Sequence, residues 1–315
     1  MLQSHWHVIM IDAVEQEIRS TSLYKPSIAF VGNIASISSL VASALRKQGY
    51  RADVYQPDIN TTSRDNDAII INKKLHNLPL ERTVRKTYHR LKNKYEVEIL
   101  SHSQPYTRAK HRVMIYHGSD IRNNPTSAKY PCFYTTKDLA QYFDGDVVFL
   151  PRCADIEMFR PKERIPVEDE LIVGHFTTQP KLKGTQLVID AVKYLNQTGM
   201  KTRLVTGWVQ REKLAESVSQ CHVICDQFLL ANYGVLAIET LLMNRPVVCY
   251  VKDEFIDYPE MKEQITNCEP TPESIAKAIK QSIDKKINYS LVSKLYSPQN
   301  TANILIDALK AWKMI

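Results

Sequence analysis

A single carboxylate interrupts an apolar stretch that has the character of a helix. The segment ANYGVLAIETLLMNRPVV runs from Ala231 to Val248, and Glu239 stands in its middle among alanine, isoleucine and leucine. An ionised carboxylate outside water is costly unless hydrogen bonds or an opposite charge compensate it. A ribose can do so, since its two hydroxyls can both donate to one carboxylate. The alternative is a solvent-facing glutamate, but its apolar neighbours leave little polar face.

A second group of chemically useful residues precedes a predicted helix that starts at Gly184. The segment HFTTQPKLKGT carries hydroxyl and ammonium groups on Thr177, Thr178, Lys181 and Lys183. Backbone amides, a helix dipole and a lysine together stabilise phosphate, so the segment is a candidate diphosphate cradle. The glycine pattern of a Walker loop is absent. The alternative is a solvated lysine pair, which we favour for Lys181.

The third group follows the apolar run RVMIY. The segment YHGSDIR places His117, Gly118, Ser119 and Asp120 at the carboxyl end of a predicted strand. A histidine there can orient a hydroxyl, a glycine lets a backbone approach closely, and an acid can accept a proton. A simple turn with a hydrogen-bonding histidine explains the same letters, and the residues alone leave both interpretations open.

Strands and helices alternate along the chain in a way that would position these groups. In the first half, SIAFVGN predicts a strand ending near Gly32, residues 34–50 a helix, and residues 51–57 a strand. In the second half, strand 171–174, helix 184–199 and strand 203–206 are followed by two more helix and strand pairs, with Tyr233 and Gly234 opening the last helix. This predicts an α/β fold of two Rossmann-like, doubly wound parallel-sheet domains facing a cleft, where ligands bind.

Domain boundaries follow from the same pattern. Residues 151–166 are proline-bearing and charged at their end, which suits a linker. We expect an N-terminal extension over 1–25, a first domain over 26–155 and a second over 156–297. Residues 298–315 predict a C-terminal helix that packs back toward the first domain.

Composition narrows the class of protein. The chain has 315 residues, of which 44% are hydrophobic and 24% charged, typical of soluble globular proteins. Its net charge of +7 favours anionic partners without choosing among them. The six cysteines lack the paired spacing of a zinc site, which predicts buried free thiols and no structural metal. Residues 1–19 are too interrupted by charge to form a signal peptide or membrane span, so we expect a cytoplasmic protein.

The most basic stretch of the chain is LERTVRKTYHRLKNKY, residues 80–95. Its apolar residues recur at helical spacing, and the remaining positions carry the cations Arg82, Arg85, Lys86, Arg90, Lys92 and Lys94. Such a helix would suit peripheral binding to an anionic membrane that holds lipid-linked acceptors. A helix packed on the core by its apolar stripe fits equally well.

These segments, in this order, resemble the retaining glycosyltransferases of family 4, which have the two-domain B-type fold. The resemblance runs from about residue 26 onward. It rests on VGNIASISSLVASALRKQGY, YHGSDIR, LPRCADIEMFRP, KGTQLVIDAV and YGVLAIETLLMNRPVV, of which the last is the most specific.

The resemblance implies transfer of a sugar from a nucleotide diphosphate sugar to an acceptor hydroxyl, with retention, no metal and no cofactor. On that basis Lys183 would neutralise the leaving diphosphate, and His117 would lie near the reacting sugar. Ser119 and Asp120 would face the acceptor. The donor would be bound by Gly32, Asn33, Thr177, Thr178, Lys181, Gly184, Tyr233, Gly234 and Glu239.

The sequence departs from the family pattern at two places. The family has two glutamates bracketing seven residues, and here the first position is Ala231. The family's arginine after the first strand of the second domain is absent too, with His175, the two threonines or Lys181 as candidate replacements.

Three other functions remain compatible with these residues. A nucleotide-sugar epimerase would isomerise its donor without consuming an acceptor. A catalytically silent sugar-nucleotide-binding protein would bind without turnover. A nucleic-acid-binding or DNA-glucosylating protein would bind DNA with steep salt dependence, although the sequence has no recognition-helix or aromatic-platform pattern.

Overall fold

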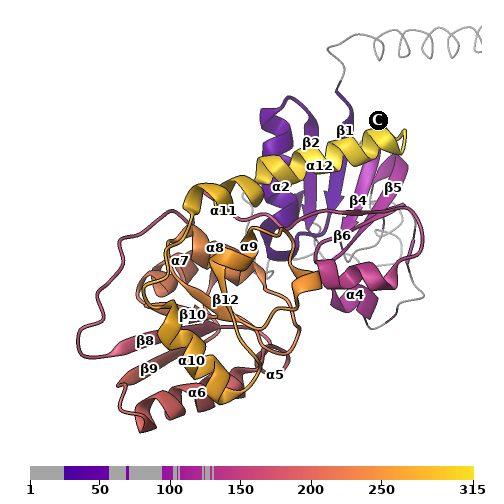
Figure 1. The fold of residues 1–315 in the computed structure, drawn as a ribbon. Coiled ribbons are helices and arrows are strands. Elements are labelled where there is room, and N and C mark those ends of the chain that lie inside the picture. The colour runs from indigo at the N-terminus through magenta and orange to yellow at the C-terminus, as the bar shows by residue number, and fades with distance from the viewer. Residues whose placement is uncertain are drawn as a thin grey trace, which may run out of the picture.

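The computed structural model describes residues 25–56, 69–70, 94–101, 105, 107–122, 124, 128–129 and 131–315. In these residues the chain forms two α/β domains, each built on a parallel sheet (Figure 1). The predicted fold class is therefore confirmed. The expected N-terminal extension lies outside the described residues except for Lys25.

The first domain contains a seven-stranded sheet in the order β3-β2-β1-β4-β5-β6-β7. Every neighbouring pair is parallel. The strands are β1 (Ser27–Val31), β2 (Arg51–Gln56), β3 (Ile69–Ile70), β4 (Lys94–Ser101), β5 (Arg108–Tyr116), β6 (Cys132–Tyr134) and β7 (Val147–Phe149). Strand order reverses beside β1, where β2 leads one way and β4 the other. In doubly wound sheets ligands bind at such a switch point.

Helices cover this sheet. They include α2 (Ile37–Lys47), the single-turn α4 (Ser119–Arg122), and the 3₁₀ segments η1 (Ile34–Ser36) and η4 (Lys137–Tyr142). The C-terminal helix α12 (Pro298–Ala311) also lies on this domain, against α2 (Figure 1). Leu305 and Leu309 of α12 are fully buried in one cluster with Val41 and Leu45 of α2. Thus the last helix completes the core of the first domain.

The second domain contains a five-stranded parallel sheet in the order β12-β11-β10-β8-β9. Its strands are β8 (Leu171–Phe176), β9 (Thr202–Gly207), β10 (Val223–Cys225), β11 (Val247–Cys249) and β12 (Ile265–Asn267). The helical segments are α5 (Pro180–Lys183), α6 (Thr185–Gln197), α7 (Arg211–Ser219), α8 (Val235–Leu242), η5 (Asp253–Phe255), α9 (Met261–Gln264), α10 (Pro272–Ser282) and α11 (Tyr289–Leu295). The strands and helices predicted from residue 171 to the strand β11 are confirmed here, whereas α5, η5, α9, β12, α10 and α11 were not predicted.

One predicted helix is wrong at its end. The basic stretch 80–95 was expected to be helical throughout, but Lys94 and Tyr95 open strand β4, and Lys94 stands in register with Arg108 of β5. Tyr95 is buried, and its hydroxyl donates to Asp53 at 2.6 Å and lies 2.8 Å from the Tyr55 hydroxyl. Sheet pairing thus overrides the helical spacing. The other cations of the stretch lie outside the described residues, so its proposed membrane contact stays a prediction.

Two buried polar contacts tie the domains together. The Asn232 side-chain amide, from the second domain, donates to the carboxylate of Asp138 in η4 of the first. Asp138 also accepts from Arg122 on α4. At the crossover between domains, Arg152 pairs with Asp257 at 2.8 Å, both side chains being nearly inaccessible. These contacts fix the relative position of the two sheets.

All six cysteines are free thiols, and Cys268 is the one that is partly exposed. Among the helices that the structure describes, none combines the length and the apolar character needed to cross a membrane.

Candidate functional site

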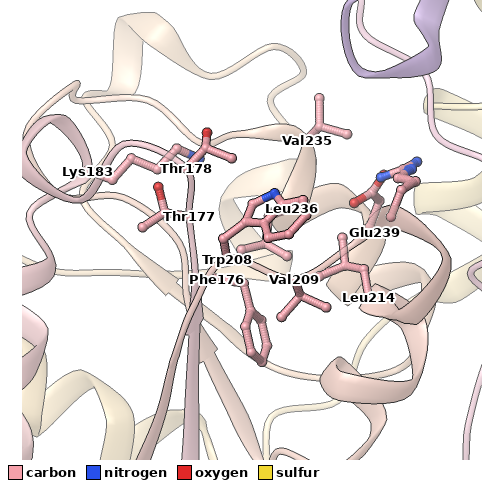
Figure 2. Close-up of a pocket in the computed structure, with 11 residues that line it drawn as sticks. Phe176, Thr177, Thr178, Lys183, Trp208, Val209, Leu214, Val235, Leu236 and Glu239 are labelled. Carbon is pink, nitrogen blue, oxygen red and sulfur yellow. The ribbon is translucent and has the colours of Figure 1, made fainter. Parts of the chain in front are cut away.

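A cavity of about 210 Å³ lies in the second domain, at the carboxyl ends of strands β8 and β9 (Figure 2). It is lined by Phe176, Thr177, Thr178, Lys183, Trp208, Val209, Arg211, Leu214, Val235, Leu236 and Glu239. In the view of Figure 2, Lys183, Thr177 and Thr178 lie toward one end, Glu239 toward the other, and the indole of Trp208 between them. We call this cavity the donor pocket, after the donor-binding role that the sequence predicts for several of its residues.

The cationic end of the donor pocket is built by the segment after β8. Thr177 and Thr178 follow the strand directly, and the Thr177 hydroxyl accepts a hydrogen bond from the Gln179 amide at 2.9 Å. A one-turn helix, α5, then carries Lys183 back to the pocket. Gly184 follows with φ of 78°, a left-handed conformation that favours glycine and lets α6 start in a new direction. The segment predicted to be a loop therefore contains a helical turn, which places Lys183 in the lining of the pocket.

The opposite end holds an ion pair between Glu239 of α8 and Arg211, the first residue of α7. Glu239 is 1% exposed, and burial raises the pKa of its carboxyl group to about 7 although Arg211 acts in the other direction. The guanidinium also lies over the ring of Phe159, 4.9 Å from its centroid. The buried carboxylate foreseen from the sequence is real, but its partner in this structure is a side chain of the same chain.

Trp208 contributes an aromatic face to the pocket. It follows β9 directly and is 58% exposed, the most exposed of the large apolar side chains among the described residues. A tryptophan held in water at the carboxyl end of a parallel strand offers a flat surface to a ligand. The sequence analysis did not select Trp208 or Arg211 as site residues. For Trp208 a signal was available, because it directly follows Gly207 at the end of a predicted strand.

Of the two predicted donor residues that precede α8, Tyr233 contacts other parts of the protein. Tyr233 is fully buried, and its hydroxyl lies beside that of Tyr296 and accepts from the Asp257 amide at 3.2 Å. Its side chain is therefore part of the hydrophobic core and does not line the donor pocket. Gly234, by contrast, caps α8 next to Lys183.

Neither His175 nor Lys181, two of the candidate replacements for the arginine of the resembled family, lines the donor pocket. His175 is buried, its ring nitrogens lie 2.9 Å from the Cys225 carbonyl and 2.8 Å from the Thr185 hydroxyl, and burial lowers its pKa. The side chain is therefore satisfied inside the domain as a neutral ring. Lys181 is exposed and does not line the pocket. The second cation of the pocket is Arg211.

The first-domain candidates form a separate group. His117 Nε2 lies 2.7 Å from the Ser101 hydroxyl. The Asp120 carboxylate accepts from the backbone amides of His117 and Gly118 at 2.7 to 3.1 Å, so it shapes the loop. The side chain of Ser119 lies outside the described atoms.

Gly32 and Asn33 lie where β1 leads into the following helix. Gly32 has φ of 92° and donates to the Tyr55 carbonyl at 2.8 Å. The Asn33 side chain bonds both the amide and the hydroxyl of Ser39 on α2. Among the first-domain candidates whose side chains the structure describes, none lines the donor pocket, whereas Thr177, Thr178, Lys183 and Glu239 of the second domain are brought together there.

Comparison with known proteins shows the fold. No family model matches the sequence, and no curated protein matches it. Solved structures do match over nearly their whole length. A glycosyltransferase from Rickettsia africae is 13% identical, with a TM-score of 0.60 over 92% of this chain and 99% of that one. The chain has the two-domain Rossmann-like fold of the B-type glycosyltransferases.

Two further solved structures share this fold. A UDP-GlcNAc 2-epimerase from Methanocaldococcus jannaschii is 12% identical, with a TM-score of 0.50 over 90% of this chain and 99% of that one. An α-glucosyltransferase in complex with UDP and a 13-mer DNA is 9% identical, with a TM-score of 0.58 over 92% and 99%. At such identities the likeness concerns architecture.

In the part of the chain that the structure describes, no group of three or more His, Cys, Asp or Glu side chains is arranged to hold a metal ion.

Proposed function

We propose that this protein is a glycosyltransferase that moves a sugar from a nucleotide diphosphate sugar to an acceptor hydroxyl, with retention and without a metal. The observation that carries the proposal is the donor pocket, which combines phosphate-binding groups, an aromatic face and a buried carboxylate in one cavity. The shared architecture with sugar-nucleotide enzymes supports it.

The diphosphate would lie at the cationic end. Lys183 and the hydroxyls of Thr177 and Thr178 can donate hydrogen bonds to its oxygens. Arg211 lies at the opposite end, where it pairs with Glu239. When the bond between the anomeric carbon and the diphosphate oxygen breaks, negative charge grows on that oxygen. A fixed ammonium group nearby lowers the energy of this transition state. Lys183 is therefore the residue on which we expect turnover to depend most.

The nucleoside would occupy the other end. The Glu239 carboxylate can accept hydrogen bonds from the two ribose hydroxyls, which would replace or share its contact with Arg211. The exposed indole of Trp208 offers a face for a flat base. The acceptor would approach from the first domain, on the side of His117. Its hydroxyl forms the new bond to the anomeric carbon and its proton passes to the departing diphosphate.

Substitution of Lys183 tests the proposal. In Lys183→Ala we expect weaker binding of nucleoside diphosphates and a loss of turnover of about 100-fold or more. Lys181→Ala is a matched control, because Lys181 lies on the same helical turn but is exposed and outside the pocket. Thermal shift with UDP, GDP and ADP identifies the ligand, since bound ligand raises the melting temperature. Donor and product are then followed during turnover.

Equal activity of the two variants would remove Lys183 from the mechanism. The products decide among the other functions. Isomerised donor without acceptor consumption would indicate an epimerase, and nucleotide binding with no turnover on any acceptor would indicate a silent binding protein.

A further inference from the structure

Asp226 is a buried carboxylate at the cationic end of the donor pocket that the proposed reaction leaves without a task. It follows β10 directly and is 0% exposed. Its Oδ1 lies 3.4 Å from Nζ of Lys183, and its Oδ2 accepts a hydrogen bond from the backbone amide of Gly234 at the start of α8.

The three groups are in close contact. A Cβ placed on Gly234 would come within 3.0 and 3.1 Å of the two Asp226 carboxylate oxygens and 3.2 Å of Lys183 Nζ. These distances are tighter than ordinary Cβ contacts, so a side chain at position 234 would require the carboxylate or the ammonium group to shift by a few tenths of an ångström. The glycine at the start of α8 thus leaves room for the lysine and the aspartate to meet.

An ammonium group and a backbone amide at a helix start are the groups by which proteins bind phosphate. Here both already bind a carboxylate of the same chain. The positive charge that a diphosphate would neutralise is thus partly neutralised by Asp226 before any ligand binds. Lys183 still has two further N–H donors, because Asp226 takes at most one of its three.

We propose that Asp226 is the internal counter-anion of the diphosphate subsite, which holds Lys183 in place and weakens the binding of the diphosphate through like-charge repulsion. The inference rests on the proposed function of the donor pocket. Its consequence is that the nucleoside diphosphate product leaves more readily than it would from a pocket of Lys183 and Arg211 alone. Asp226 acts through Lys183 and the ligand's charge, so it is a positioning and affinity-setting residue.

Asp226→Asn separates this role from a structural one. Asparagine has nearly the same shape, and its carbonyl oxygen can still accept from Gly234 and Lys183, but it carries no charge. We expect inorganic pyrophosphate and UDP to bind about ten-fold more tightly in calorimetry at low salt, and turnover to fall because product release slows. A merely structural residue would give weaker binding when altered. Unchanged or weaker pyrophosphate binding would overturn the proposal.

Asp190→Asn is the matched control, since Asp190 is an exposed carboxylate on α6 that pairs with Lys193 at 3.0 Å and does not line the pocket. It should leave both affinities unchanged. Asp226→Ser is a second variant in which a hydroxyl can accept from Gly234, and the same tightening is expected. If neither variant at position 226 folds, the residue is a structural one and the proposal is overturned.

The two probes also separate this inference from the proposed function. Tighter pyrophosphate binding by Asp226→Asn, without UDP, GDP or ADP binding to the unaltered protein, would support the counter-anion and contradict the nucleotide-sugar function. Nucleoside diphosphate binding to the unaltered protein, with no change in Asp226→Asn, would support the function and contradict the counter-anion.

Discussion

Glu239 is the residue at which burial, charge and proposed ligand binding meet. Its apolar neighbours in the sequence predicted a buried carboxylate in need of a partner, and in the structure the partner is Arg211. Nothing in the sequence pairs these two positions, since one opens α7 and the other lies within α8. Removing a buried charge's only counter-charge is costly. A ribose that donates to Glu239 must therefore share the carboxylate with Arg211, so that the guanidinium keeps its counter-charge.

The raised pKa of Glu239 makes a prediction about stability. The pKa is about 7 in the folded protein and 4.5 for an ordinary glutamate, so between these values the folded state binds more protons than the unfolded state. The corresponding contribution to the free energy of unfolding is present below the unfolded pKa and is lost as pH rises through about 7. The glutamine in Glu239→Gln cannot ionise, so the variant does not lose this part of the unfolding free energy as the pH rises. We therefore expect the difference in unfolding free energy to move in favour of the variant between about pH 5 and about pH 8.

Urea unfolding at the two pH values measures this difference. Glu212→Gln serves as control, because Glu212 is an exposed glutamate on α7, beside Arg211. A stability difference between Glu239→Gln and the unaltered protein that stays the same at both pH values would contradict the assignment.

At the scale of elements, the alternating strands and helices of the second domain were predictable because hydrophobic periodicity dominates there. The strands β8, β10 and β11 are nearly all buried residues, and α6 buries one stripe of its surface. The helical turn α5 was not predictable, since four residues carry no periodicity. The start of β4 was mistaken for helix because Tyr95 fits an apolar stripe as well as a strand.

The C-terminal helix α12 makes a prediction at this scale. Its Leu305 is fully buried in the core of the first domain. In the sequence, the second domain lies between the first domain and this helix. Leu305→Ala should lower the free energy of unfolding by about 2–5 kcal/mol through lost burial and a cavity. Asp307→Ala, at an exposed position of the same helix, should change it by about 0.5 kcal/mol or less. Denaturant unfolding compares them, and equal effects would show that α12 contributes little to this core.

At the scale of the whole molecule, the bond between Asn232 and Asp138 couples the domains. It joins the loop that follows Ala231, where the family that the sequence resembles has a glutamate, to η4 of the first domain. Ala231 itself has φ of 53° and its carbonyl accepts from the Lys252 amide at 3.0 Å. The loop is therefore held by the domain interface, and the backbone at position 231 is fixed without a glutamate.

Asn232→Ala tests this coupling. The variant leaves Asp138 with Arg122 but removes the bond across the interface, at a cost of about 1.5–3 kcal/mol for a hydrogen bond to a charged group. We expect calorimetric unfolding to broaden or split, because the domains then unfold less cooperatively. Gln197→Ala removes an exposed amide on α6 and should leave the transition unchanged. A single sharp transition in both variants would show that other contacts carry the coupling.

By itself the sequence determined the fold class, the order of elements and the buried position of Glu239, since hydrophobic periodicity and the cost of burying a charge are local properties. It also selected the segments that carry Lys183 and the two threonines. Only the tertiary structure decided which charges meet. The contacts of Arg211 with Glu239, Asp226 with Lys183 and Asn232 with Asp138 join different elements, and no spacing along the chain encodes them. Such pairs depend on how elements pack, which is where the chemistry of this protein is set.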